Sequence, residues 1–406
     1  MAHTQTIEAP RRHPRQRLWQ GILALWENVQ TYARQPVGDA KKVTWRDWLL
    51  AAVLFASVGL LRVIALALDD DARGVQYFFY DWDGKNYLAI AEYGYFTADG
   101  TGDPDPAIYE RRLAFFPALP MLMRAGNQLF GLEYHVVGLG IAQLAGWLTM
   151  VGIMVMVARM GYGLRERCFG VLLFLGAPMA ITMHMVYTEP LYLMLLVWAA
   201  VALHADKLGW AAILIFASGF TRLTAIDLVI AFGVVVFLRH RRSMRAWAYV
   251  VFSSLSIVGY LIWVSLVSGD SGSYFEMQRK GWSSSFDLGL SSVRWIFGAF
   301  STGQTWGHYV AAACIIGSVA VAIFAWQRMP FAYWIMATGV VANVVLSGGF
   351  LYSRPRLLLV AMVLALPLVQ YVQRWPAWLS RGLLGLWLVH SLAFGTWMMA
   401  YSQYAI

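Results

Sequence analysis

Charged residues are scarce in this chain of 406 residues. Only 13% of them are Asp, Glu, Lys or Arg, whereas an ordinary soluble domain has about 25%. Cysteine is also rare, and the two cysteines, Cys168 and Cys314, lie in or beside apolar segments. A disulfide framework is therefore not expected. Together with 59% hydrophobic residues, these shortages indicate a membrane protein with no disulfide scaffold.

Several functional motifs are missing as well. The sequence has no phosphate-binding P-loop, no dinucleotide glycine fingerprint, no zinc-ligand spacing and no nucleophile elbow, so soluble nucleotide-driven chemistry has no support. The N-terminal residues contain no short apolar core followed by a small-residue cleavage site, and the first apolar run is expected to direct insertion itself. The net charge is +9, but the basic residues recur in short clusters, so no nucleic-acid partner is expected.

Long apolar runs make up most of the chain, and a helix that crosses the hydrocarbon core needs about 20 mostly apolar residues. The runs predict an all-α polytopic membrane protein with about 11 transmembrane helices. They cover residues 47–68, 136–158, 168–182, 189–204, 210–220, 226–238, 247–268, 306–326, 330–347, 357–373 and 382–400. Several are short, and the pair around Thr221 and Arg222 is alternatively a broken or re-entrant hairpin.

The basic residues predict the orientation of these helices. Residues 1–46 contain eight Lys and Arg and are expected to form a cytoplasmic tail, with an amphipathic helix that lies in the interface or packs on the protein. Residues 47–406 are expected to form the transmembrane domain. Two long loops, 69–114 and 269–305, fall outside, and the first is acidic and is expected to carry interfacial helices. An odd number of crossings places the C-terminus outside.

Unusual polar residues gather in the loops expected outside, which suggests one cleft, because ionisable groups near hydrocarbon are costly. Asp81 and Asp83 follow the first apolar run. A carboxylate there could act as a general base on an acceptor hydroxyl, could help to hold a divalent metal, or could only cap a surface helix. Tyr187 and Glu189 begin a later run, where substrate contact and helix capping explain the glutamate equally well.

Two further clusters belong to the same face. Residues 268–282 are rich in side chains that bind sugars, although a solvated loop is the alternative. Arg354 and Arg356 precede a long apolar run. Two guanidinium groups at this position could bind a lipid phosphate or anchor the helix to headgroups. Their place on the outer side runs against the positive-inside bias, which favours a functional role.

The motifs resemble those of a known family. WDGKNYLAIAEYGY, starting at Trp82, resembles the WD-x-x-x-Y-x-x-IA-x-x-GY signature of the PIG-V-like mannosyltransferases, which are membrane enzymes of the GT-C glycosyltransferase class. FFPALP, VYTEPLY, FTRLTA, SGDSGSYFEMQRKGW and SRPRLLL resemble the family's other elements in the same order. The matches run from Trp82 to Leu359 and cover most of the chain.

The resemblance implies a GT-C-like fold and an inverting transferase that takes mannose from polyprenyl-phosphate mannose and adds it to a glycolipid, lipoglycan or protein acceptor at the non-cytoplasmic face. Such an enzyme would lie among the lipids of a bacterial plasma membrane of the actinobacterial type. Its catalytic carboxylate maps to Asp83. No cofactor is required by this scheme, and no metal site is assigned. The donor phosphate is expected to bind Arg354, Arg356, Arg222 and Lys280. Substrate-binding residues are expected to be Asp81, Tyr187, Glu189, Asp270, Tyr274, Glu276, Gln278 and Trp282.

The sequence leaves two alternatives open. GT-C enzymes include arabinofuranosyltransferases that use decaprenyl-phosphate arabinose in cell-wall polysaccharide synthesis, so the transferred sugar is open. A flippase or transporter of lipid-linked sugars would use the same arginines and aromatic residues without covalent chemistry.

Overall fold

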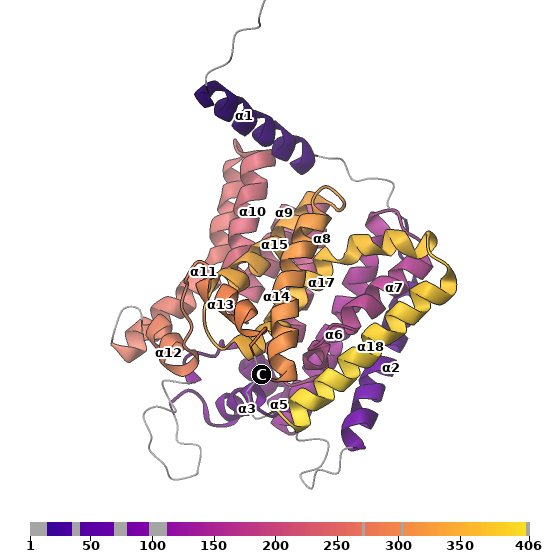
Figure 1. Ribbon diagram of the computed structural model, residues 1–406. Helices are drawn as coiled ribbons and strands as arrows, with labels where there is room; N and C mark the ends of the chain where they lie inside the picture. Colours follow the sequence, from indigo (N-terminus) through magenta and orange to yellow (C-terminus); the bar gives the residue numbers. More distant parts are fainter. Residues whose placement is uncertain are drawn as a thin grey trace, which may run out of the picture.

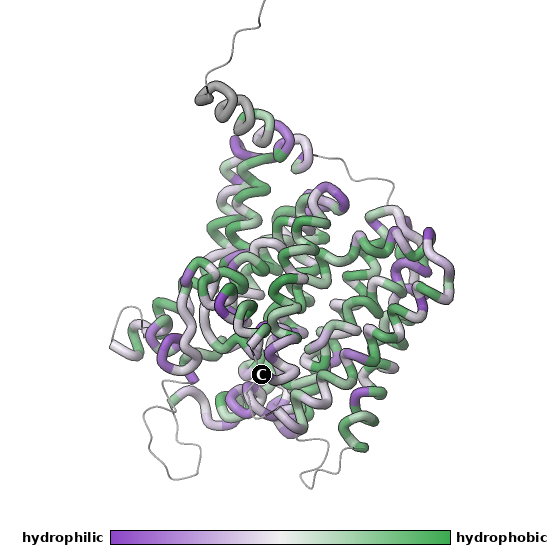
Figure 2. Tube along the Cα trace, viewed as in Figure 1, coloured by the Kyte–Doolittle hydropathy of each residue, from purple (hydrophilic) through white to green (hydrophobic). Residues whose placement is uncertain are grey.

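The computed structural model describes residues 14–34, 41–68, 79–96, 112–269, 273–301 and 304–402. Within these ranges the chain is helical, and its one β-bridge joins Phe286 and Ser347. The helices form a bundle in which apolar residues dominate the long segments (Figures 1 and 2). The prediction of an all-α polytopic membrane protein is therefore confirmed.

Five helices are long and apolar enough to cross a membrane. They are α2 (Trp45–Ala67), α6 (Tyr134–Arg159), α11 (Met244–Ser268), α14 (Trp306–Ala325) and α18 (Ala377–Ala400). A sixth span is possible if Leu351–Leu364 and Leu366–Val372 act as one, with a bend of 57° between them. That bent segment contains α16 (Arg354–Leu357) and α17 (Ala361–Leu364).

The other five predicted runs also form helices, but these are only 11 to 17 residues long. They are α7 (Leu164–Leu175), α8 (Thr188–His204), α9 (Leu208–Ser218), α10 (Ala225–His240) and α15 (Phe331–Leu346). At 1.5 Å per residue, even the 17-residue helix is about 26 Å long, which is shorter than the hydrocarbon core. Whether each of these helices makes a full crossing stays a prediction.

The core is built around α8. Fifteen of its 17 residues are buried, and it packs against α6, α9 and α15. The sequence explains this position, because α8 is apolar around its whole circumference, as expected for a helix surrounded by others. Its first turn, which contains Glu189, lies at the end of the bundle where the polar residues gather.

Short helices occupy the two ends of the bundle. α1 (Pro14–Ala33) lies at one end, where Arg239 near the end of α10 donates to the carbonyl of Ala33. α3 (Asp83–Tyr93), α5 (Ala118–Phe130), α12 (Ser273–Trp282) and α13 (Leu290–Gly298) lie toward the other end (Figure 1). Since α10 runs from its N-terminus at that end to α1, α1 and these short helices lie at opposite ends of the bundle.

Candidate active site

A cavity of about 830 Å³ opens at the end of the bundle that carries α3 and α12. Its walls come from the start of α3, the segment before α5, the connection between α9 and α10, α12 with the loop after it, and the segment from the end of α15 to α16. This volume suits a ligand of drug size. Of the predicted site residues, Asp83, Arg222, Tyr274, Glu276, Gln278, Trp282, Arg354 and Arg356 line it.

Two carboxylates and two guanidinium groups meet at one wall of the cavity. Arg356 donates to Asp83 Oδ2 at 2.6 Å, and its Nε lies 3.1 Å from Glu189 Oε1. Arg222 contacts the same glutamate oxygen at 2.5 Å. The Glu189 side chain is only 4% exposed, whereas that of Asp83 is 21% exposed. Glu189 therefore holds the two arginines from behind, and Asp83 is the member of the pair that a substrate can reach.

The backbone before α3 brings Asp83 to this position. Trp82 has φ of +55°, a conformation that is uncommon for a bulky residue and that costs free energy. The turn separates the two aspartates. Asp81 accepts a hydrogen bond from the Trp82 amide and forms an ion pair with Lys85, and it is not among the residues that line the cavity.

Tyr187 lies beneath the Arg356 guanidinium, which is 5.1 Å from the centre of its ring. The Tyr187 hydroxyl donates to the carbonyl of Asp81 at 3.2 Å, and the side chain is fully buried. Its contact is therefore with the arginine and not with the cavity.

Burial alone would lower the pKa of Arg222, but the charge of Glu189 outweighs the effect of burial, so the pKa of Arg222 is raised. Arg222 thus remains a cation next to the cavity.

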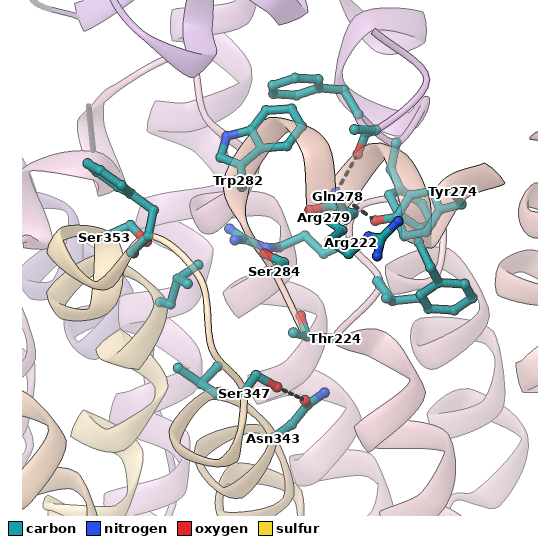
Figure 3. A pocket seen from close by; sticks show the side chains of 18 of the residues that line it. Arg222, Thr224, Tyr274, Gln278, Arg279, Trp282, Ser284, Asn343, Ser347 and Ser353 are labelled. Atoms are coloured by element: carbon teal, nitrogen blue, oxygen red, sulfur yellow. Dashed lines mark hydrogen bonds between the residues drawn. The ribbon is translucent and has the colours of Figure 1, made fainter. Parts of the chain in front are cut away.

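Helix α12 forms a second wall. Gln278 donates to the Tyr274 hydroxyl at 3.2 Å and lies 3.4 Å from the Ala114 carbonyl, as drawn in Figure 3. Burial raises the pKa of Tyr274, so its phenol remains neutral. The Trp282 ring packs edge-on against Phe115, with 5.7 Å between the ring centres. A polar wall flanked by aromatic rings suits a carbohydrate ligand.

One cation of α12 lines the cavity, but it is not the predicted one. Arg279 is among the lining residues, whereas Lys280 is not. Lys280 is 62% exposed and contacts Glu276 at 3.1 Å. The hydrogen bond from Lys280 and the positive charge of its ammonium group lower the pKa of Glu276. The helical spacing 275, 278, 279, 282 could have shown which cation shares a face with the glutamine and the tryptophan. Asp270 lies outside the described residues.

Arg354 and Arg356 make different contacts although both line the cavity. Arg354 donates to the carbonyls of Val344 and Ser347, both at 2.5 Å. It thereby satisfies carbonyls that the end of α15 leaves free. Its expected role in binding the donor phosphate stays a prediction, and the contacts show that it also fixes the end of α15.

A third wall is made by the segment after α15, and the sequence did not predict it. The loop after α12 pairs with this segment, because Gly348 donates to the Ser285 carbonyl and Gly289 donates to the Leu346 carbonyl. Gly349 has φ of +131°, and a Cβ there would lie 3.0 Å from Ser284 Oγ, so glycine is required. The lining residues missed by the sequence include Tyr87, Thr188, Thr221, Thr224, Arg279, Ser284, Ser285, Asn343, Ser347 and Ser353.

In the part of the chain that the structure describes, no three His, Cys, Asp or Glu side chains lie close enough to hold a metal ion. Asp81 and Asp83 do not converge, because Asp81 pairs with Lys85 and Asp83 with Arg356. The cations next to Asp83 are arginines, which can supply positive charge to a phosphate.

No protein-family model matches this sequence, and no curated protein matches it. Among solved structures, the chain is similar to ArnT from Cupriavidus metallidurans bound to undecaprenyl phosphate, with 15% identity and a TM-score of 0.47 over 86% of this chain and 74% of that one. It is also similar to ArnT in the apo state, with 15% identity and a TM-score of 0.44 over 92% and 62% of the two chains. The resemblance to the mannosyltransferase family stays a prediction.

Proposed function

We propose that this protein is a membrane glycosyltransferase of the GT-C class that transfers a sugar from a polyprenyl-phosphate carrier to an acceptor hydroxyl. One observation carries the proposal: an accessible carboxylate, Asp83, is bonded at 2.6 Å to Arg356 in a cavity that Arg222 and Arg279 also line. A carboxylate beside several guanidinium groups offers a proton acceptor together with a site for an anionic leaving group.

The chemistry follows from this arrangement. Asp83 takes the proton from the acceptor hydroxyl while the acceptor oxygen bonds to the anomeric carbon. The bond from that carbon to the phosphate oxygen breaks, and the polyprenyl phosphate leaves with the electron pair. Arg222 and Arg356 stabilise the negative charge that grows on the phosphate. A single displacement of this kind inverts the anomeric configuration. This scheme uses no metal ion, and we propose that transfer does not require one.

A second cavity supports a lipid-linked substrate. It has a volume of about 590 Å³, is lined almost entirely by apolar side chains and lies between α14, α18 and the bent segment. Pro355 and Leu358 line this apolar cavity, whereas Arg354 and Arg356 line the polar one. The same short segment therefore separates a cationic site from an apolar one, an arrangement that would suit a phosphate carrying a long hydrocarbon chain.

We propose mannose as the sugar on the basis of the sequence resemblance, with a glycolipid, lipoglycan or protein as acceptor. The test uses protein purified in detergent with polyprenyl-phosphate mannose or decaprenyl-phosphate arabinose as donor and a membrane glycolipid extract as acceptor. A detergent solution has no two compartments separated by a membrane, so transport cannot produce a signal in this assay. Covalent transfer that is lost with Asp83→Asn supports the proposal. Tight donor binding without transfer to any acceptor fraction would instead favour a flippase.

We also propose that the cavity faces the non-cytoplasmic side and that α1 is cytoplasmic, because the basic loops gather at the end opposite the cavity. Cysteine placed at Arg242 or at Glu276 can be probed with an impermeant thiol reagent on intact cells. Labelling is expected at position 276 and not at 242. Labelling at 242 from outside would reverse the proposed orientation.

A further inference from the structure

A buried carboxylate stands behind the wall of the cavity that the sequence did not predict. Asp227 lies in the first turn of α10, is 8% exposed, and forms no ion pair with any described residue. An ionisable residue within an apolar helix is costly and is usually functional. Its position near the N-terminus of α10 offsets part of this cost. Its contacts with a side chain of α15 point to a further role.

Those contacts form a chain that ends in the cavity. Asn343 Nδ2 on α15 donates to both carboxylate oxygens of Asp227, at 3.0 and 2.9 Å. The Ser347 hydroxyl then donates to Asn343 Oδ1 at 3.2 Å. Asn343 and Ser347 both line the cavity, and Figure 3 shows them linked together, apart from Arg222 and Arg279.

The direction of these bonds decides what the wall can bind. Because Asp227 accepts from the amide nitrogen, the Asn343 oxygen must face the serine. Because the Ser347 hydroxyl donates its hydrogen to the Asn343 oxygen, the lone pairs of the serine oxygen remain for a ligand in the cavity. Ser347 is also fixed through its backbone, since Arg354 donates to its carbonyl at 2.5 Å. The Ser347 hydroxyl, held by Asn343 and by its own backbone, therefore offers a hydrogen-bond acceptor to the cavity.

We propose that Asn343 and Ser347, oriented by Asp227, bind the hydroxyl groups of the transferred sugar and so determine sugar specificity. This inference rests on the proposed function. A sugar hydroxyl can donate to the Ser347 oxygen, whereas the oxygens of the donor phosphate only accept and cannot. The phosphate binds at Arg222 and Arg356 and the sugar ring at Ser347, which fixes the direction of the donor in the cavity. Asp227 is a positioning residue, because it acts through Asn343.

The experiment compares a ligand that carries the sugar with one that lacks it. Affinities for polyprenyl-phosphate mannose and for polyprenyl phosphate are measured with the parent protein, Ser347→Ala and Asp227→Asn, and the kinetics of transfer are measured with each. Ser253→Ala is the matched control, because Ser253 is buried and its hydroxyl donates to the Val250 carbonyl of its own helix, α11.

Ser347→Ala is expected to weaken binding of the mannose donor about 3- to 10-fold, as for loss of one hydrogen bond, and to leave the affinity for polyprenyl phosphate unchanged. Asp227→Asn frees the Asn343 amide to rotate and should have the same selective effect. A panel of monodeoxy donors provides the sharper test. One deoxy donor should be poorer with the parent protein and equal to the full donor with Ser347→Ala, because the two losses remove the same contact.

Each outcome decides between the readings. The inference would be overturned if Ser347→Ala weakened binding of the mannose donor and of polyprenyl phosphate equally, or if it showed no coupling with any deoxy donor. The transferase proposal would remain intact. If the parent protein neither binds polyprenyl phosphate nor transfers sugar, the proposed function fails and the inference falls with it. Thermal unfolding identifies any variant that misfolds. If Asp227→Asn misfolds, the test rests on Ser347→Ala.

Discussion

Replacement of Glu189 by glutamine tests whether this buried carboxylate holds the arginines of the site in place. Glu189 is 4% exposed and contacts Arg222 at 2.5 Å and Arg356 at 3.1 Å. Glutamine keeps the size of the side chain but removes its charge, so two neighbouring guanidinium groups lose their shared counter-ion. Removing one partner of a buried ion pair typically costs about 3 to 5 kcal/mol. With roughly 2.1 cal/mol/K of unfolding entropy per residue, the melting temperature should fall by about 4 to 6 °C.

The assay is thermal unfolding of the purified protein in detergent, followed by fluorescence of its tryptophans. Glu276→Gln is the matched control, because it makes the same chemical change at a 41% exposed side chain paired with Lys280. Exposed ion pairs contribute little to stability, so the melting temperature of this variant should not change. If Glu189→Gln were as stable as the parent protein, Glu189 would not be the counter-ion of the two arginines, and the ion cluster would need another explanation.

Three further predictions concern catalysis and donor binding. Asp83→Asn should lower turnover by about 100- to 10,000-fold, the range for general-base catalysis, with donor binding little changed; a larger loss from Asp81→Asn would show that the wrong carboxylate was assigned. Arg356→Lys should reduce kcat/KM for the donor about 10- to 100-fold, because lysine cannot contact two carboxylates and stack on a ring as the guanidinium does, and parental kinetics would refute this. Arg279→Ala should raise the donor KM more than Lys280→Ala does, because only Arg279 lines the cavity; the opposite order would favour Lys280 as the phosphate ligand.

Much of the architecture could be predicted from the sequence because membrane insertion imposes a strong pattern. Each of the eleven predicted apolar runs contains a helix. The polar clusters were also informative. Ionisable residues such as Asp83 and Arg222 are costly near the hydrocarbon of a membrane, so their presence there indicates a function. These two residues are more than 130 positions apart, yet they border the same cavity. Length was harder to predict, because an apolar run does not reveal where packing breaks a helix, as in the 57° bend after Leu364.

The wall formed by Asn343 and Ser347 was not predicted, because neutral polar residues at the end of an apolar run carry no charge signal. A signal was nevertheless present in Asp227, a single acid within the apolar run at 226–238. An isolated carboxylate in such a run must find a hydrogen-bond donor. That donor, Asn343, lies 116 positions away, and only the packing of α10 against α15 identifies it.

The same limit explains why Arg354 and Arg356 were given one role from the sequence. Residues two apart on a helix point in different directions, but the sequence does not say what lies in either direction. In the structure, the Arg354 guanidinium donates to the carbonyls at the end of α15, whereas Arg356 contacts Asp83 and Glu189. Both arginines line the cavity, and Arg354 fixes the end of α15, near Asn343 and Ser347, to the short segment that also carries Arg356. If the proposed function holds, Arg354→Ala should therefore disturb the wall formed by Asn343 and Ser347, whereas Arg356→Ala should remove the positive charge beside Asp83.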